Sequence, residues 1–354
     1  MHKETPLLAA HQQLGAKLTE FGGWDMPLQY EGIVAEHNAV RNDCGIFDVS
    51  HLGKLRVTGA DGGAALQMAV TADVEALEIG RAKYALVLTE DAGTIDDIFV
   101  YRIGPEEWLA VPNASNVDAV AAAISDQGYG PTDEWDRYAI LAVQGPNSFA
   151  VFESVFPGSG ATELKLHSWA VLDVFGAEGL VARTGYTGER GFELYAPFET
   201  AERTFHALIE AGAKPIGLGA RDTLRLEMGY ALYGHELSLE TNPIEAGLSW
   251  AIAWDSEFRG KAALVKVKEG GPTRKLFGVR CADRGVPRQG YAVLRGDDHV
   301  GEVCSGNFSP TLGTGIALAF GDASAMPEPG EKVAIEARGR RIEGDIVKPP
   351  FIKQ

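Results

Sequence analysis

The chain lacks the residues and motifs that mark several common protein classes. Its 354 residues contain only three cysteines, Cys44, Cys281 and Cys304, and so small and odd a number excludes a disulfide framework. We expect all three to be buried, because free cysteine is among the most buried residue types. The sequence has no CxxC, HExxH, P-loop or G-x-S-x-G motif. No metal site and no common nucleotide or hydrolase motif is therefore expected.

Positive charge is also scarce. The 32 Lys and Arg residues face 49 Asp and Glu residues, which gives a net charge of −17. This charge argues against general binding to nucleic acid or to anionic membranes, since both are themselves negative. No apolar run is long enough to cross a bilayer, and the start of the chain has no signal-like apolar region. We expect a cytoplasmic protein.

What remains is an ordinary globular composition with short, turn-rich elements. Hydrophobic residues make up 45% and charged residues 23% of the chain, and its length suggests about two or three domains. Strand-like runs such as YALVLT, TIDDIFVYRI and EEWLAVP are separated only by turns. A second meander runs through VLDVFG, LVARTG and GFELYA. Because strands joined by short turns pair antiparallel, we predict an α+β fold and not a doubly wound parallel sheet.

The composition and the hydrophobic pattern of the sequence change after Trp250. A Lys-, Gly- and Pro-rich stretch follows, and from residue 275 onward almost everything alternates in short runs typical of a β-barrel. We therefore expect an α+β region over residues 1–255, an irregular linker over 256–274 and a C-terminal β-barrel over 275–354.

The first candidate site is the pair Asp96-Asp97 at the head of the strand-like run IDDIFVYRI. Neighbouring strand residues point to opposite faces, so only one of the two carboxylates can face a given cavity. The alternative is a solvated strand entry after the EDAG turn, and the residues alone favour that alternative.

Two further charged residues stand in unusual positions. Glu193 lies inside the apolar run GFELY, where it either alternates outward or turns inward to a hydrogen-bond donor or a cation. Arg221 lies near the start of a predicted helix, where the helix dipole disfavours a cation, which suggests an external anionic partner. Arg225, four residues later, is expected to pair with Asp222 or Glu227 on the surface.

Other polar and aromatic residues have simpler interpretations. Asp48, Ser50 and His51 lie too close in sequence to form a catalytic triad without an unusual loop. The six tryptophans, among them Trp24 and Trp250, are expected to be core or inter-domain contacts. These residues alone do not identify a reaction.

Several blocks spread along the whole chain resemble one family. EFGGWDMPLQY, AVRNDCGIFDVSHLGKLRVTG, GTIDDIFVYRI, ARTGYTGERGFELY, GLGARDTLRLEMGYALYGHEL and SGNFSPTLGTGIALAF occur in the order found in the T-protein of the glycine cleavage system, a tetrahydrofolate-dependent aminomethyltransferase. The resemblance implies two α+β domains and a C-terminal β-barrel, all arranged around a central folate cavity. One α+β domain, at about residues 52–137, is inserted into the other.

The resemblance also assigns roles to particular residues. It implies that Asp97 is the catalytic aspartate, which reverses the interpretation of the acidic pair and leaves Asp96 as its outward-facing neighbour. It implies that Glu193 hydrogen-bonds the pterin edge and that Arg221 lies near the reacting end of the folate. Tyr186 and Asn113 are further expected contacts of the pterin.

The implied reaction takes an aminomethyl group from the lipoyl arm of the carrier H-protein. Its products are 5,10-methylenetetrahydrofolate, ammonia and the dihydrolipoyl carrier, and it needs no metal or redox cofactor. The basic segment Arg259–Lys275 is a candidate docking surface for an acidic carrier, or else a solvated linker. A folate-dependent demethylase and a non-enzymatic folate-binding protein are the alternative functions.

Overall fold

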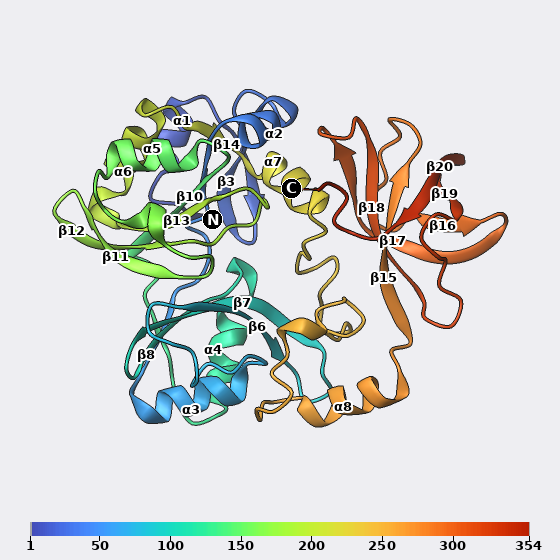
Figure 1. The fold of residues 1–354 in the computed structure, drawn as a ribbon, viewed down its shortest axis with the longest axis horizontal. Helices are drawn as coiled ribbons and strands as arrows, with labels where there is room; N and C mark the ends of the chain where they lie inside the picture. Colours follow the sequence, from blue (N-terminus) through green and yellow to red (C-terminus); the bar gives the residue numbers. More distant parts are fainter. Residues whose placement is uncertain (1, 354) are drawn as a thin grey trace. The chain divides into compact units, whose positions relative to one another are not determined.

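The structure is a computed structural model that describes residues 2–353. It divides into two compact units, each built from segments that are distant in sequence. The first unit contains the chain up to Val87 together with Asp97–Arg221, and the second contains Leu88–Asp96 together with the chain from Asp222 onward. The mixture of helices with several largely antiparallel sheets confirms the predicted α+β class (Figure 1).

A six-stranded sheet is the larger of the sheets in the first unit. Its order is β11-β12-β13-β10-β4-β14. The strands are β4 (Gly45–Asp48), β10 (Tyr138–Gln144), β11 (Trp169–Val174), β12 (Ala177–Ala182), β13 (Gly191–Pro197) and β14 (Lys214–Ile216). All neighbours are antiparallel except β4 and β14, which run parallel. The β11-β12-β13 meander confirms the hairpins predicted from the sequence.

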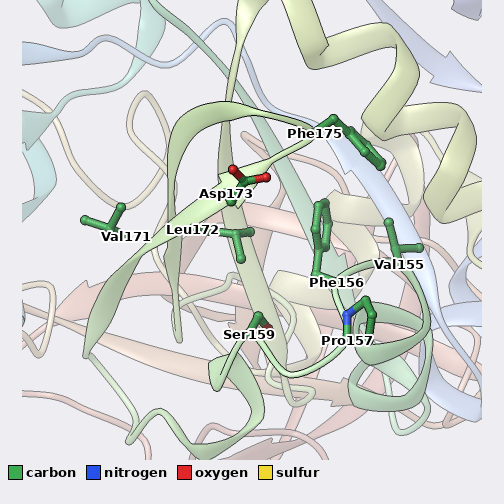
Figure 2. A pocket seen from close by; sticks show the side chains of 8 residues that line it. All are labelled: Val155, Phe156, Pro157, Ser159, Val171, Leu172, Asp173 and Phe175. Atoms are coloured by element: carbon green, nitrogen blue, oxygen red, sulfur yellow. The ribbon is translucent and has the colours of Figure 1, made fainter.

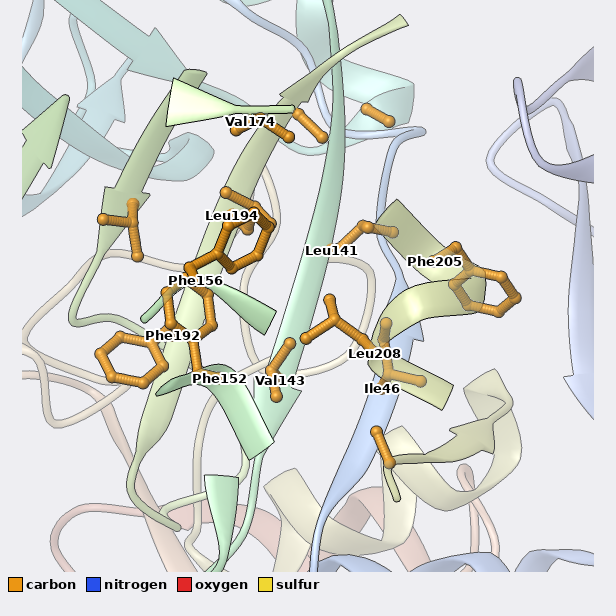
Figure 3. Close-up of a cluster of buried hydrophobic side chains, with 14 of the residues drawn as sticks. Ile46, Leu141, Val143, Phe152, Phe156, Val174, Phe192, Leu194, Phe205 and Leu208 are labelled. Carbon is orange, nitrogen blue, oxygen red and sulfur yellow. The ribbon is translucent and has the colours of Figure 1, made fainter. Parts of the chain in front are cut away.

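One face of this sheet carries the main hydrophobic core. Helices α5 (Ser148–Val155) and α6 (Phe198–Glu210) cover that face. Phe192 and Leu194 of β13 point into the core together with Leu141 of β10, Phe152 of α5 and Phe205 of α6 (Figure 3). Since side chains alternate along a strand, the residues between them on β13 lie on the opposite face of the sheet.

A five-stranded sheet lies mostly in the first unit, and the end of β6 and the start of β7 belong to the second. Its order is β6-β7-β8-β5-β9. The strands are β5 (Leu55–Thr58), β6 (Ala82–Leu88), β7 (Thr94–Gly104), β8 (Glu107–Val111) and β9 (Thr132–Asp133). Helix α3 (Gly59–Ala69) packs on β5 and β8 and against helix α4 (Val117–Ser125). The consecutive order of β6, β7 and β8 agrees with the predicted meander.

The start of the chain forms a small sheet with the order β1-β3-β2. Its strands are β1 (Lys3–Glu4), β2 (Lys17–Phe21) and β3 (Trp24–Gln29), and the nearby helices are α1 (Leu8–Gln13), α2 (Ile33–Asn42) and α7 (Leu218–Glu227). Gly217 precedes α7, and a Cβ added there would lie 2.2 Å from the carbonyl oxygen of Leu28. The chain can therefore enter α7 along this path only with glycine at that position.

The second unit contains the predicted barrel. Six strands close on themselves in the order β15-β18-β17-β16-β19-β20. They are β15 (Arg274–Cys281), β16 (Ala292–Arg295), β17 (Asp298–Ser309), β18 (Thr314–Asp322), β19 (Lys332–Ala337) and β20 (Arg340–Val347). Small and β-branched side chains such as Val279, Val303, Ala317 and Ile335 form its core.

Two expectations about local structure need correction. The segment expected to be an irregular linker contains the helix α8 (Lys261–Gly270). Trp250, expected to be a core or inter-domain contact, is 69% exposed and lies in the short 3₁₀ helix η3 (Ser249–Ala251). Within residues 2–353 the structure also has the 3₁₀ helices η1 (Ala114–Asn116) and η2 (Ala161–Glu163). Trp24, by contrast, is buried as expected.

Arg225 is also placed differently from the prediction. It was expected on the surface, but its side chain is only 2% exposed. Its guanidinium pairs with Asp222 at 2.9 Å, which is one of the two partners expected from the sequence. It also pairs with the buried Glu236 at 3.1 Å. Glu227 instead accepts hydrogen bonds from the hydroxyl groups of Ser309 and Thr311. This network belongs wholly to the second unit.

Candidate functional site

Asp97 is held in a fixed orientation on β7. The hydroxyl of Tyr84, on β6, donates to Oδ2 of Asp97 at 2.9 Å, and the Asn113 amide donates to Oδ1 at 3.1 Å. The same amide nitrogen also reaches the backbone carbonyl oxygen of Asp97 at 3.2 Å. Asp96 points to the opposite face of the strand and is completely buried, so it is not the solvated neighbour that the sequence suggested.

A line of aromatic rings leads from Asp97 to β13. Phe99 and Tyr101 lie two and four residues beyond Asp97 and thus on the same face of β7. The centroid of the Phe99 ring is 5.8 Å from that of Tyr84 and 6.3 Å from that of Tyr101. Tyr101 in turn packs edge-to-face on Tyr195 of β13 at 5.6 Å. The face of β7 that carries Asp97 therefore meets the face of the six-stranded sheet opposite to the main core.

Glu193 lies on this second face, two residues before Tyr195. It is only 9% exposed, and its carboxylate accepts a hydrogen bond from the hydroxyl of Thr184. The hydroxyl of Tyr101 lies 3.2 Å from that of Thr184. The hydroxyls of Tyr101 and Thr184 and the carboxylate of Glu193 therefore form one buried polar cluster. Burial, together with the charge of Glu193, raises the pKa of Tyr101 and keeps its proton in place. Glu193 thus turns inward, as one of the two sequence interpretations has it.

Arg221 lies in the first turn of α7, beside the ring of Tyr186. The centre of its guanidinium is 4.7 Å from the centroid of that ring, a cation–π contact. Burial lowers the pKa of Arg221, while the charge of Glu193 and the nearby Tyr186 act in the opposite direction. Nη1 of Arg221 is buried and has no hydrogen-bond partner. A desolvated cation with an unused N–H donor beside a carboxylate is suited to bind a polar ligand.

The five residues singled out from the sequence thus fall into two groups within the first unit. Asp97 and Asn113 are in direct contact with each other, and Arg221 is in direct contact with Tyr186. Glu193 belongs with the second pair through its electrostatic interaction with Arg221. The aromatic line connects the two groups.

Three residues in this region were missed by reasoning from the sequence. Tyr84 and Tyr101 each have one charged and one apolar neighbour in their strands, and Thr184 follows β12. Nothing in those patterns separates them from ordinary half-buried strand residues. The only available signal for Tyr84 was the hairpin itself, because pairing of β6 with β7 brings Tyr84 close to the acidic pair.

A second buried network surrounds Asp48, at the end of β4. Its carboxylate accepts hydrogen bonds from Thr5, from the backbone and hydroxyl of Ser50, and from Nε2 of His11 at 2.9 Å. The other ring nitrogen of His11 is 2.9 Å from the hydroxyl of Tyr30. Burial alone would raise the pKa of Asp48, but its hydrogen bonds with His11, Ser50 and Thr5 and the charge of His11 lower that pKa to about 2. Asp48 pairs in register with Leu141, a core residue, so this network braces the core face.

Other features of residues 2–353 add no candidate site. No group of three or more His, Cys, Asp or Glu side chains in this range could hold a metal ion. Within the same range, no helix is both long and apolar enough to cross a membrane. A groove lies between the end of α5 and the edge strand β11 (Figure 2). Its eight lining residues include none of the predicted site residues.

Comparison with protein families gives two matches that together span almost the whole chain. Residues 7–256 match the GCVT N-terminal domain. Residues 274–353 match the glycine cleavage T-protein C-terminal barrel domain. The second match covers the closed barrel of β15–β20.

Individual relatives agree with the family matches. The chain is 45% identical over 358 residues to an aminomethyltransferase of Halothermothrix orenii, covering 99% of this chain and all of that protein. It is 46% identical over 355 residues to an aminomethyltransferase of Mycobacterium tuberculosis, covering 98% of this chain and 96% of the relative. The crystal structure of glycine cleavage system aminomethyltransferase T from Bartonella henselae superposes with a TM-score of 0.92 at 31% identity, covering 99% of this chain and 98% of the other.

Proposed function

Since this chain belongs to the glycine cleavage T-protein family and is an aminomethyltransferase, we propose that it takes its aminomethyl group from the lipoyl arm of a carrier protein and gives it to tetrahydrofolate. The sulfur–carbon bond of the aminomethyl thioether breaks, and two bonds from folate nitrogens to the transferred carbon form. The carbon–nitrogen bond to ammonia breaks as the second of these closes the ring. The two protons of the folate N–H groups end on the released thiol and on ammonia.

Asp97 is the catalytic residue in this proposal. This role is supported by the fixed orientation of the Asp97 carboxylate, which accepts hydrogen bonds from Tyr84 on one side and from Asn113 on the other. The carboxylate lies on the face of β7 that packs, through Tyr101, against the strand that bears Glu193. An oriented carboxylate stabilises the positive charge that develops on the transferred carbon, and it accepts a proton from a folate nitrogen. Groups of this kind contribute roughly 10²–10⁴-fold to a rate.

In this proposal Glu193 binds the pterin edge, and Arg221 binds the pterin close to the reacting end of the folate. A pterin edge presents N–H donors beside a carbonyl acceptor, and the two side chains offer the complementary acceptor and donors. Glu193 is buried and fixed by Thr184, while Arg221 has a buried N–H group without a partner. Tyr186 completes this end of the site through its contact with Arg221, and Asn113 lies at the other end beside Asp97. These features fit tetrahydrofolate as the second substrate.

The role of Asp97 is tested with the variant Asp97→Asn. It keeps the size of the side chain but removes the charge and the proton acceptor, so we expect turnover to fall about 10²–10⁴-fold while tetrahydrofolate still binds. Asp118→Asn, at an exposed position on α4, is the matched control and should be unaffected. Near-normal turnover of Asp97→Asn would exclude the catalytic role.

The role of Glu193 is tested separately by calorimetry. Glu193→Ala removes a buried acceptor, and we expect tetrahydrofolate affinity to fall at least tenfold, as is typical when a hydrogen bond to a charged group is lost. Thermal unfolding of the same variant shows whether the fold is intact. Equal folate affinity in the wild type and in Glu193→Ala would contradict the assignment.

For the carrier, we propose docking on the basic segment Arg259–Lys275. Several of its cations have partners inside the second unit: Lys261 pairs with Glu257, and Lys268 lies 3.9 Å from the centroid of the Trp254 ring. Lys266 and Lys268 are both exposed on α8. Reversing the charge of both should raise KM for the carrier without changing folate affinity, because rim charges act on encounter. An unchanged KM would favour the solvated-segment interpretation.

A further inference from the structure

His51 and Arg221 follow neighbouring parallel strands and emerge at the same edge of the six-stranded sheet. β4 and β14 pair in parallel, with Phe47 opposite Ile216. His51 lies three residues after the end of β4, and Arg221 lies five residues after the end of β14, in the first turn of α7. Across the sheet, Phe47 pairs with Ala142 of β10, and Ala142 pairs with Glu193 of β13. Phe47 and Glu193 therefore lie at the same level of the sheet and on the same face.

Both side chains hold a buried nitrogen that has no partner. Among residues 2–353, four buried side-chain atoms lack a hydrogen-bond partner, and two of them are Nδ1 of His51 and Nη1 of Arg221. His51 is only 3% exposed, and its ring packs edge-to-face on Phe21 at 5.5 Å. Leaving such groups desolvated and unpaired is costly, and more so for a charged group. Two such nitrogen atoms at one edge of the sheet indicate that a bound ligand supplies their missing hydrogen-bond partner.

The charges around His51 fix its protonation state. Burial and the neighbouring charge of Arg221 lower the pKa of His51 to about 3, with a smaller effect in the same direction from Lys54 and an opposing one from Asp48. The imidazole is therefore neutral near pH 7 and has one N–H group to donate. A neutral donor beside a cationic donor suits a ligand oxygen that accepts two hydrogen bonds.

We propose that the imidazole of His51 and the guanidinium of Arg221 together bind the 4-oxo oxygen of the pterin ring, which makes His51 a specificity-determining residue. This inference rests on the proposed function. In a pterin, the N3–H group is next to the C4 carbonyl, so a ligand whose N3–H group donates to Glu193 brings the 4-oxo oxygen toward Arg221, whose charge interacts with that carboxylate. His51, electrostatically coupled to Arg221 at the same sheet edge, supplies the second donor.

The proposed site should discriminate between 4-oxo and 4-amino pterins. A 4-amino group would place its N–H donors against the N–H donors of His51 and Arg221, and a site built for an acceptor rejects such a ligand. The 4-amino compound also lacks the N3–H group that faces Glu193, so part of the discrimination is independent of His51. The informative quantity is thus the change in preference for the 4-oxo compound when His51 is replaced.

The experiment measures Kd by calorimetry for tetrahydrofolate and for its 4-amino-4-deoxy analogue, under anaerobic conditions. The proteins are the wild type, His51→Leu, His51→Asn and His206→Leu. Asn keeps an N–H donor near the position of the imidazole Nδ1 and should rescue the preference. His206, a half-exposed residue of α6 on the core side of the sheet, is the matched control. Thermal unfolding shows whether each variant folds, and His51→Ala replaces His51→Leu if that variant does not.

We expect the wild type to prefer the 4-oxo ligand and His51→Leu to lose about tenfold or more of that preference, as for one lost hydrogen bond to a buried group. His51→Asn and His206→Leu should keep most of it. A preference unchanged in a folded His51→Leu or His51→Ala would overturn the inference and leave the proposed function intact. Failure of the wild type to bind tetrahydrofolate at all would instead refute the proposed function, and the inference with it.

Discussion

Replacement of Asp48 by asparagine should destabilise the enzyme strongly and in a pH-dependent way. The carboxylate of Asp48 is fully buried and accepts hydrogen bonds from Thr5, His11 and Ser50. The amide of the Asp48→Asn variant would place an NH₂ group against at least one of these donors. Breaking a buried charged pair from one side typically costs about 3–5 kcal/mol, and we expect a loss of that size in the free energy of unfolding at pH 7.

The pH dependence follows from the lowered pKa of Asp48. The pKa is about 2 in the folded protein and 3.8 as the usual value, so the ionised carboxylate contributes about 2 kcal/mol of stability at neutral pH. A depressed carboxyl pKa gives stability that is present above the unfolded pKa and lost as the pH falls through the folded one. We expect this contribution to fall by about 1 kcal/mol by pH 3 and by about 2 kcal/mol by pH 2.

Urea unfolding of wild type and Asp48→Asn at several pH values between 7 and 2 separates this residue from all other carboxylates. The difference in unfolding free energy between the two proteins should shrink by about 2 kcal/mol on acidification, because only the wild type has Asp48 to protonate. A difference that stays constant from pH 7 to pH 2 would refute the reasoning about this network. So would a variant as stable as the wild type at pH 7.

Three further predictions concern single side chains. Tyr84→Phe removes one hydrogen bond to Asp97, and we expect kcat to fall about tenfold with folate affinity unchanged; steady-state kinetics with an unchanged kcat would show that Tyr84 does not position the carboxylate. Gly217→Ala puts a Cβ 2.2 Å from the Leu28 carbonyl oxygen, so thermal unfolding should reveal a loss of roughly 1–3 kcal/mol, whereas an unchanged melting temperature would mean that this loop yields freely. The Cys44 thiol is buried, and burial together with Asp43 raises its pKa to about 12; it should react with a thiol reagent only in urea, and rapid labelling of the native protein would contradict its burial.

Elements governed by local patterns were predictable from the sequence. Alternation and turn residues identified both antiparallel meanders and the closed barrel, because hydrophobic periodicity and tight turns are local properties. The burial of Cys44, Cys281 and Cys304 was also predicted correctly, and all three are at most 8% exposed. The helix α8 was missed, since the Gly, Pro and Lys residues around it resemble a linker.

The site depends on contacts between distant parts of the chain, which no local pattern reveals. The sequence left two directions open for Glu193, because strand alternation does not say which face is covered. The pairing of His11 with Asp48 joins residues 37 positions apart, and the burial of Arg225 depends on Glu236 and Ser305. In each case a polar residue is defined by a partner that only the tertiary fold supplies.

The central claim is tested most directly by one reaction. The purified enzyme is mixed with a lipoyl carrier loaded with the aminomethyl group, with and without tetrahydrofolate, and ammonia and 5,10-methylenetetrahydrofolate are both measured. We predict that both products form in equal amounts and only when tetrahydrofolate is present. Tight binding of tetrahydrofolate without turnover, or release of ammonia that does not depend on it, would contradict the proposed reaction.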